Sequence, residues 1–567
     1  RFDTHWQFVN VSCQACHGNA EGHQQWLRNQ QPSSVAHSGF AATLAERGSW
    51  YLPEKASIAR RRDQPDGGQL SACGQCHSLG TRIDSWQPGS QFEDHLSLML
   101  PNTPLYHLDG QIDAEVFVAG SFRQSKMHDA GVVCSDCHNP HSLTLRAEGN
   151  ALCSQCHLPD HYDRPAHHGH LEHSRGAQCV NCHMPATVYM GVDARRDHRF
   201  GIPSPALSKA IGVPNACSQC HVDKSPDWLI AGMPGSTTQA DAVSLWLHQL
   251  DRGEITALPR LLDYVSTANG HRFRQARVMA ALGAQMDDPA LTELARRKLR
   301  SHDPALQRAA VEILERLPLD DRLLMLLPHL DEPVKSVRLA VARVLAEGLV
   351  RGDLSDADRQ RLSRRAEEYR QSLRRNADHP ASQIALGNLS LALGDEEAAG
   401  NAYRQALRID VSYSPASINL ADLYRQRGDE AKAQQILLSA RQQADDAAIS
   451  YALSMSYFRQ RKLDDGLDAI SHAVTLAPMN SDYVYAQAVA LEQSGQPLAA
   501  ITALEQALKR QGERRQLVEL LSLYAVNYQL PAEALPHVLR WRTLAPDDRR
   551  AAAIEQGLRR QLARPTQ

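Results

Sequence analysis

One short motif with chemically reactive residues occurs six times in this sequence. In each copy two cysteines stand three positions apart and a histidine follows the second at once, as in CSDCH at 134–138. The copies use all twelve cysteines of the 567-residue chain. The cysteine pairs are Cys13/Cys16, Cys73/Cys76, Cys134/Cys137, Cys153/Cys156, Cys179/Cys182 and Cys217/Cys220, and the histidines that follow them are His17, His77, His138, His157, His183 and His221.

Three chemistries use a C-x-x-C pair, and the residue after the pair separates them. A structural zinc ion takes four ligands, commonly from two such pairs, and a redox dithiol takes one pair in a βαβ setting. A c-type haem takes C-x-x-C-H: the cysteines form thioethers to the porphyrin and the histidine is the proximal ligand of the iron. Histidine follows all six pairs, which zinc and dithiol sites do not require. The sequence therefore predicts six molecules of haem c.

The opposite face of each haem iron needs a second ligand or an open site, and histidine is abundant around the motifs. Thirteen further histidines occur in the first 221 residues, whereas only seven occur in the rest of the chain. The distal candidates are His23, His95, His107, His128, His141, His168 and His198, where His168 stands for one of the three histidines in AHHGH at 166–170. For each of them, a surface or hydrogen-bonding role is the ordinary alternative. His23 and His141 follow their own motifs so closely that each is expected to reach a neighbouring haem.

The charge and composition of the whole chain exclude several kinds of partner. The formal net charge is −3, so no basic excess indicates nucleic acid or an anionic membrane surface. No apolar run is long enough to span a bilayer. Aromatic residues make up only 5% of the chain, which is low for side-chain cores of this total length. We expect the predicted porphyrins to supply that core, and we expect Arg1 to be a processed or truncated start.

A change of composition near residue 235 divides the chain. Residues 1–230 are rich in Cys, His, Pro and Gly, and GMPGSTTQ at 232–239 has the composition of a linker. The stretch 237–350 repeats Arg-x-Ala at a period near 30, with Pro at helix starts, which predicts HEAT-like helical repeats. We interpret 351–379 as a helical connector.

From residue 380 to residue 560 a second period predicts tetratricopeptide repeats. GDEEAAGNAYRQAL begins at Gly394 and GDEAKAQQILLSA begins at Gly428, an offset of 34 residues. A 34-residue helix-turn-helix unit is typical of this repeat, and stacked units leave a concave face for partners. The predicted fold class is therefore mostly α: a haem-packed N-terminal cytochrome domain with little regular structure, followed by an α-solenoid.

The motif surroundings resemble a known family. SCQACHGNAEGH, GVVCSDCHNPHS, CVNCHMPATVYM and PNACSQCH are similar to segments of the multihaem c-type cytochromes related to pentahaem nitrite reductase and hydroxylamine oxidoreductase. The resemblance is closest to bacterial members with a C-terminal tetratricopeptide region, and it covers nearly the whole chain. It implies distal roles for His141 in CHNPH and for His23 in CHGNAEGH. It also implies further haem motifs, up to two, before Arg1.

The same resemblance leaves the activity open. The catalytic haem of nitrite reductase typically uses lysine in place of the motif histidine, and this sequence has no C-x-x-C-K. The leading hypothesis is electron transfer along closely spaced, mostly bis-histidine haems, with the helical repeats docking redox partners or further copies of the chain. One alternative is an oxidoreductase whose open haem reduces a small nitrogen or sulfur oxyanion, and another is a subunit of an extracellular cytochrome filament. Covalent haem attachment implies a periplasmic or extracellular location.

Overall fold

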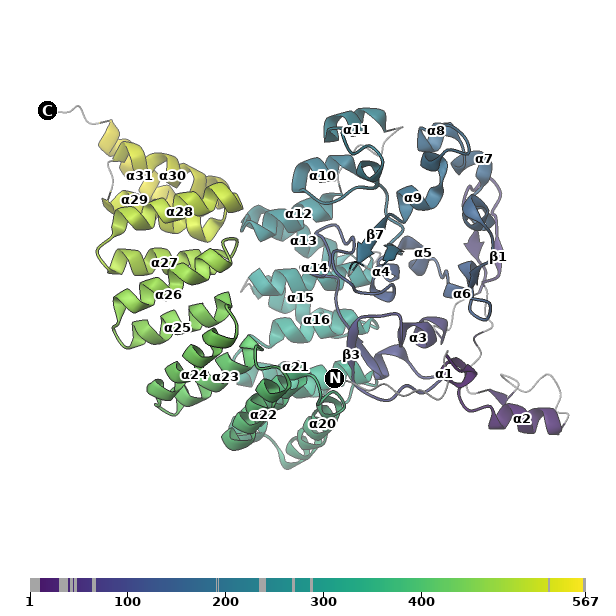
Figure 1. The fold of residues 1–567 in the computed structure, drawn as a ribbon, viewed down its shortest axis with the longest axis horizontal. Coiled ribbons are helices and arrows are strands. Elements are labelled where there is room, and N and C mark those ends of the chain that lie inside the picture. The colour runs from purple at the N-terminus through teal and green to yellow at the C-terminus, as the bar shows by residue number, and fades with distance from the viewer. Residues whose placement is uncertain are drawn as a thin grey trace. The chain divides into compact units, whose positions relative to one another are not determined.

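The chain forms two compact units in the computed structural model (Figure 1). The first contains Arg1–Leu247, Leu261–Leu317 and Leu324–Val341, and the second contains His248–Arg260, Pro318–Leu323 and Ala342–Gln567. The structure describes residues 11–29, 39–40, 44, 48–63, 68–189, 191, 193–233, 241–267, 271–285, 289–528 and 531–563. The predicted linker at 232–239 lies outside the described residues from residue 234 onward.

Short elements make up the cysteine-rich part of the first unit. Four antiparallel strand pairs join β1 (Trp50–Tyr51) to β2 (Arg60–Arg61), β3 (Gly80–Arg82) to β4 (Leu96–Leu98), β5 (His138–Asn139) to β6 (Thr144–Leu145), and β7 (Ala186–Tyr189) to β8 (Asp193–Arg196). The helices are α1 (Cys13–His17), α2 (Glu21–Arg28), α3 (Gly68–Gly74), α4 (Ala119–Phe122), α5 (Lys126–Asp129), α6 (Cys134–Cys137), α7 (Pro159–Tyr162), α8 (Pro165–His168), α9 (Cys179–His183), α10 (Pro205–Ile211) and α11 (Pro226–Gly232). The 3₁₀ turns include η2 (Phe92–Asp94), η3 (Gly149–Gln155), η4 (Arg175–Ala177) and η5 (Ala216–Gln219). Most of these helices are too short to be stable alone, so tertiary contacts must hold them.

Longer helices follow the cysteine-rich part, and several of them belong to the same unit. They are α12 (Ala242–Asp251), α13 (Leu258–Ser266), α14 (Arg272–Gln285), α15 (Pro289–Lys298), α16 (Pro304–Leu314), α17 (Leu319–Leu326), α18 (Lys335–Leu345) and α19 (Gly348–Arg351). Helix α16 packs on α14 and α15. The HEAT-like classification of these helices stays a prediction.

Buried ion pairs join these helices to the cysteine-rich part of the first unit. The Arg123 guanidinium contacts Glu93 at 3.2 Å and Asp303 at 3.5 Å, and all three side chains are almost fully buried. Arg308 donates hydrogen bonds of 2.6 Å to the Ser97 hydroxyl and to the Leu98 carbonyl. The first unit therefore does not end where the composition changes near residue 235.

The second unit is a helical-repeat array. Helix α20 (Asp356–Arg374) precedes α21 (Pro380–Ala392), α22 (Glu396–Ile409), α23 (Ser414–Gln426), α24 (Glu430–Gln443), α25 (Ala447–Arg459), α26 (Leu463–Leu476), α27 (Ser481–Gln493), α28 (Pro497–Gln511), α29 (Arg515–Tyr528), α30 (Pro531–Leu544) and α31 (Arg549–Leu562). The first helices of successive pairs begin at residues 380, 414, 447, 481 and 515, so the repeat is 33 or 34 residues long. Each helix packs on the next, as the green-to-yellow stack in Figure 1 shows. The predicted period of 34 is confirmed as a helix-turn-helix unit.

Ordinary apolar packing holds these repeats together. The side chains of Leu504, Leu517, Leu521 and Trp541 are fully buried in one cluster contributed by successive helices. An aspartate caps the second helix of the first two pairs. The Asp395 carboxylate accepts a hydrogen bond from the Ala398 amide, and the Asp429 carboxylate accepts one from the Lys432 amide. No helix in the described part of the chain is long and apolar enough to cross a membrane.

Candidate functional site

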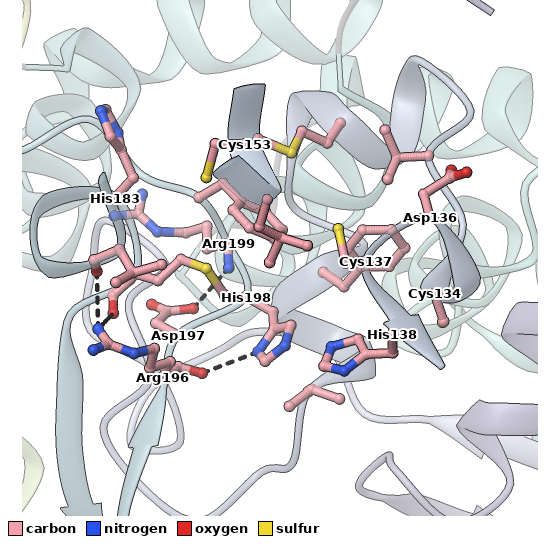
Figure 2. A pocket seen from close by; sticks show the side chains of 18 of the residues that line it. Cys134, Asp136, Cys137, His138, Cys153, His183, Arg196, Asp197, His198 and Arg199 are labelled. Atoms are coloured by element: carbon pink, nitrogen blue, oxygen red, sulfur yellow. Dashed lines mark hydrogen bonds between the residues drawn. The ribbon is translucent and has the colours of Figure 1, made fainter. Parts of the chain in front are cut away.

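A large cavity lies within the first unit, and residues of all six cysteine motifs line it. Its volume is about 3100 Å³, whereas a pocket for one small ligand or cofactor typically has ~300–1,000 Å³. The six motifs therefore face one shared space with room for several large groups, rather than six separate pockets. Figure 2 shows part of this cavity, where the third, fourth and fifth motifs meet.

The sixth motif differs from the others in its second cysteine. Cys220 is exposed and does not line the cavity. Cys13 and Cys76 are also exposed, yet both line it. Of the sixth motif only Cys217 lines the cavity in the described part of the chain; Cys220 and His221 do not.

The position of this motif in the fold gives the physical reason for the exposure of Cys220. The turn η5 ends at Gln219, and Cys220 is its C-terminal cap. This turn packs on α9 of the fifth motif, and Cys220 lies at its end. Attachment of haem through Cys220 stays a prediction.

The backbone of each motif makes one tight helical turn. The amides of His77, His157 and His221 each donate a hydrogen bond of 2.9–3.0 Å to the carbonyl of the first cysteine of their motif. Residues at positions i, i+3 and i+4 of a helix lie on one face. The two sulfurs and the imidazole of a motif are therefore presented on the same side, as attachment of one flat macrocycle would require.

Neighbouring motifs also approach one another. Helix α1 packs on α3 and α3 on α6, while η3 packs on α9 and α9 on η5. A hydrogen bond with Cys134 raises the pKa of the Cys73 thiol. Burial, together with the nearby charges of Asp136 and Cys156, raises the pKa of Cys137 to about 11. The motifs are not joined by disulfides.

Four motif histidines face a second imidazole in a nearly parallel arrangement. In His17/His141 the ring centroids are 6.1 Å apart and the ring planes make an angle of 9°, and in His138/His198 the values are 6.4 Å and 23°. In His183/His167 they are 6.2 Å and 15°, and in His221/His170 they are 6.1 Å and 28°. Direct ring stacking would bring such centroids closer. Two metal–nitrogen bonds of about 2 Å, plus ~1 Å from each nitrogen to its ring centroid, give a separation of about 6 Å. Each pair is therefore spaced to hold one metal atom between its rings.

Backbone carbonyls fix the orientation of several paired rings. Nδ1 of His183 donates to the Gly201 carbonyl at 2.9 Å, and Nδ1 of His198 donates to the Arg196 carbonyl at 3.0 Å, as Figure 2 shows for His198. A carbonyl can only accept, so Nδ1 must carry the proton in both rings. Nε2 is then left with a free lone pair, which is the state that a ligating imidazole needs.

The remaining distal candidates have other neighbours, although His23 also lines the cavity. The ring of His23 stacks on Phe40 at 4.1 Å. His95 lies 2.5 Å from the Ser90 hydroxyl, His107 is 3.4 Å from Asp113, and His128 is 3.4 Å from Asp129. In AHHGH the structure brings His167 and His170, rather than His168, opposite motif histidines.

Two motif histidines have a different environment. Among the described residues, neither His77 nor His157 faces a second imidazole in this way; His157 lies edge-on to Tyr162, with centroids 5.5 Å apart. Burial lowers the pKa of His157, so its imidazole is neutral near pH 7. The spare histidines His5 and His37 lie outside the described residues.

A zinc site of the usual kind needs a different arrangement. Structural zinc takes four side-chain ligands around one point. Within the ranges that the structure describes, no three His, Cys, Asp or Glu side chains converge in a way that could hold one metal ion. Paired imidazoles supply two protein ligands per metal, which suits an iron whose other four ligands come from a porphyrin.

Several cavity-lining residues were missed by the sequence analysis because they belong to the helical part of the chain. They are Asp241, Tyr264, His271 and Arg274. Burial alone would raise the pKa of Asp241, but the charge and hydrogen bonds of Arg274 and the hydrogen bonds of Ser244 lower it instead. The recurrence of Arg-x-Ala around Arg274 indicated only a helical repeat, so no local signal separated this arginine from a packing residue.

Comparisons with known proteins identify the repeat region alone. The family model for the tetratricopeptide repeat matches residues 380–411. Curated proteins give no match. The chain is similar to a solved structure of MamA, with 19% identity, coverage of 30% of this chain and 92% of that chain, and a TM-score of 0.26. It is also similar to YrrB, described as a TPR protein with an unusual peptide-binding site, with 17% identity, coverage of 34% of this chain and 99% of that chain, and a TM-score of 0.27. For the C-terminal part of a TPR protein from Cytophaga hutchinsonii the identity is 14%, the coverage is 44% of this chain and 98% of that chain, and the TM-score is 0.28. The chain is thus mostly helical with a C-terminal tetratricopeptide region, a type of repeat that commonly mediates protein interactions.

Proposed function

We propose that this chain is an electron-carrying multihaem c-type cytochrome with a repeat region that docks partners. The observation that carries the proposal is the set of four parallel imidazole pairs, each of which contains the histidine of a C-x-x-C-H motif. A generic helical protein has no reason to space imidazoles about 6 Å apart in this way. Haem iron, when bound, supplies a reversible one-electron couple whose potential is set by its axial ligands and their surroundings.

Different residues of the chain would attach the haems, ligate their irons and orient the ligands. The twelve cysteines, the exposed Cys220 included, would hold six haems through thioethers, and the six motif histidines would be their proximal ligands. His141, His198, His167 and His170 would be distal ligands of the haems on His17, His138, His183 and His221. His23, His95, His107 and His128 stay predictions for the two other sites. The carbonyls of Gly201 and Arg196 would keep His183 and His198 in the ligating tautomer.

The repeat region would provide the docking surface. Tetratricopeptide repeats stack into a solenoid with a concave face, and such faces commonly bind other proteins. We expect the partner to be a redox protein or a further copy of the chain. Covalent haem attachment places the proposed cytochrome in the periplasm or outside the cell.

Intact-protein mass spectrometry of the full chain, produced in a host that attaches haem c, tests this function. We expect a mass increase of six haems for the motifs of this sequence. The double variant Cys217→Ala/Cys220→Ala should lose one of the six, and Ser218→Ala between them is the matched control that should lose none. A purified chain without covalent haem would overturn the proposal.

Reduction of a small oxyanion is a second candidate function, favoured by basic side chains in the cavity lining. Lys126, Arg199, His271 and Arg274 all line the cavity, although Arg199 and Arg274 pair with Asp109 and Asp241. The same residues would also suit the propionates of bound haem. Turnover of nitrite, hydroxylamine and tetrathionate with a reduced one-electron dye separates the two roles. A rate no higher than that of free haem would exclude the enzyme.

A further inference from the structure

The segment 165–170 presents two imidazoles to two different motifs within four residues. His167 lies near the end of the short helix α8, and its ring faces His183 of the fifth motif. His170 follows Gly169, and its ring faces His221 of the sixth motif. Helix α9 of the fifth motif packs on η5 of the sixth, so one short segment can reach both.

The turn between the two histidines depends on a glycine. Gly169 ends α8 with φ 72° and ψ 11°, in the left-handed region, and its amide donates to the Pro165 carbonyl at 2.8 Å. A residue with a Cβ atom adopts this left-handed conformation only at a conformational cost, which glycine avoids. This C-terminal cap ends the helix after His168, so that His170 leaves it in a new direction and does not continue along the face of His167.

His168 is used to hold His170. The backbone amide of His170 donates to Nδ1 of His168 at 3.2 Å. In return, Nδ1 of His170 donates to the His168 carbonyl at 2.5 Å, which leaves Nε2 of His170 free to ligate. The two rings lie 6.3 Å apart but are tilted by 36°. Nδ1 of His168 is thus engaged as an acceptor within the turn.

A second glycine makes room for the His170 ring. A Cβ atom built on Gly176 would lie 2.2 Å from Cδ2 of His170 and 2.5 Å from Cγ, which is far inside van der Waals contact. Gly176 belongs to η4, which packs on both α8 and α9. Any larger residue there would displace the imidazole from its position opposite His221.

We propose that residues 165–170 form a clamp that ligates two haems, with His167 on the iron of the fifth motif and His170 on the iron of the sixth. The proposal rests on the proposed function and deepens it. His168 is a positioning residue that orients His170. Because the two ligands are three residues apart on one rigid turn, the clamp also fixes the spacing of the two macrocycles.

Electron paramagnetic resonance of the oxidised full chain, together with haem content by mass, tests the clamp. His167→Ala and His170→Ala should each convert about one haem in six from low-spin to high-spin relative to wild type, with all six haems still attached. His168→Ala removes the positioning residue but neither proposed ligand, so it should leave the other low-spin haems unchanged and disturb the His170 site by less than His170→Ala does. Added imidazole should restore the low-spin signal in the first two variants.

Three further variants keep the test decisive if a site opened by alanine fails to fold. In His167→Met and His170→Met the thioether can still ligate, and one haem should move to a higher reduction potential. Gly176→Ala should reproduce the high-spin signal of His170→Ala and leave the His167 site intact.

The possible failures are distinguishable. Wild-type protein without covalent haem would end the proposed function. Wild-type protein with six haems, but no spin change in His167→Ala or His170→Ala, would overturn only the clamp. A high-spin haem in His168→Ala that is absent in His170→Ala would assign the ligand to His168 and would also overturn it.

Discussion

The cysteine-rich stretch and the repeat region differ most in what fills their interiors. Between Ala119 and Ala177 no apolar side chain is buried, although two complete motifs lie in that stretch. In the repeat region Leu504, Leu517 and Trp541 are fully buried within one continuous cluster. The repeat region can thus be stabilised by its own side chains. The cysteine-rich stretch has a small apolar cluster of Tyr106, Ile112, Val116 and Tyr189, and the large cavity takes up the space beside its motifs.

Helix length follows the same division. The helices α6 and α8 have four residues each, whereas the paired repeat helices α21–α30 have 13 to 15. Forming the first turn of a helix is unfavourable, and a four-residue helix never recovers that cost through propagation. The motif turns must be held by what they contact, and the repeat helices are held by packing along their whole length.

The largest effect should come from removing the cysteines of a central motif. We expect Cys134→Ala/Cys137→Ala to destabilise the cysteine-rich part as a whole, because the third motif packs on the second and its histidine pairs with His198. Limited proteolysis followed by mass spectrometry should degrade that part and leave a resistant fragment from about residue 380 onward. If the protease degraded the cysteine-rich part and the repeat region equally, the difference between the interiors of the two regions would be contradicted.

Trp541→Ala should have the converse effect. Truncation of a fully buried Trp typically costs ~3–5 kcal/mol, and here the loss should appear in the unfolding of the repeats. The absorption spectrum of the proposed haems should stay unchanged. Chemical denaturation followed by circular dichroism measures the first quantity, and optical spectroscopy measures the second. Leu498→Ala, an exposed position on α28, is the control.

Glu93→Ala should weaken the first unit by about 3 kcal/mol, because it leaves the buried Arg123 guanidinium without its nearest carboxylate. Thermal unfolding followed at the haem absorption band would report the change. Glu93→Gln keeps a hydrogen-bond acceptor and should be milder. A loss confined to the repeat region would contradict the assignment of this ion pair to the first unit.

Arg427→Ala should have the smallest effect. Arg427 pairs with Glu396 of the preceding helix pair at 2.7 Å, but both side chains are substantially exposed. Exposed pairs contribute roughly 0–1 kcal/mol and weaken with salt. Denaturation at low and high ionic strength should show a small difference that salt removes. A loss above about 2 kcal/mol would mean that the repeats depend on surface charge more than on their core.

The repeats were predictable because their signal is periodic. The offset between Gly394 and Gly428 corresponds to the step from one helix pair to the next. The resemblance to multihaem cytochromes and the predicted haems are not tested by the comparisons, which identify the repeat region alone.

The exposure of Cys220 could not be predicted from its motif. CSQCH at 217–221 has the same pattern as CSDCH at 134–138, yet Cys137 lines the cavity and Cys220 does not. The difference comes from the elements that surround each turn in the fold. The residues of the motif itself do not determine those elements.

Spacing in the sequence also could not decide which distal histidine faces which motif. His167, His168 and His170 are near neighbours of one type, and the choice among them depends on the left-handed turn at Gly169 and on the space beside Gly176. Contacts of this kind come from tertiary structure, which a local motif does not encode.

The pairing of His17 with His141 bears on the order in which a newly made chain is completed. His141 comes 124 positions after His17, so the first motif emerges long before its second imidazole exists. His167 and His170, by contrast, precede His183 and His221 in the chain. The second imidazole of these two pairs has therefore already been synthesised when the motif is made. Among the four paired motifs, the one at residues 13–17 is synthesised first, and the longest stretch of chain separates it from its second imidazole. A chain interrupted anywhere before residue 141 would leave that site open on one side.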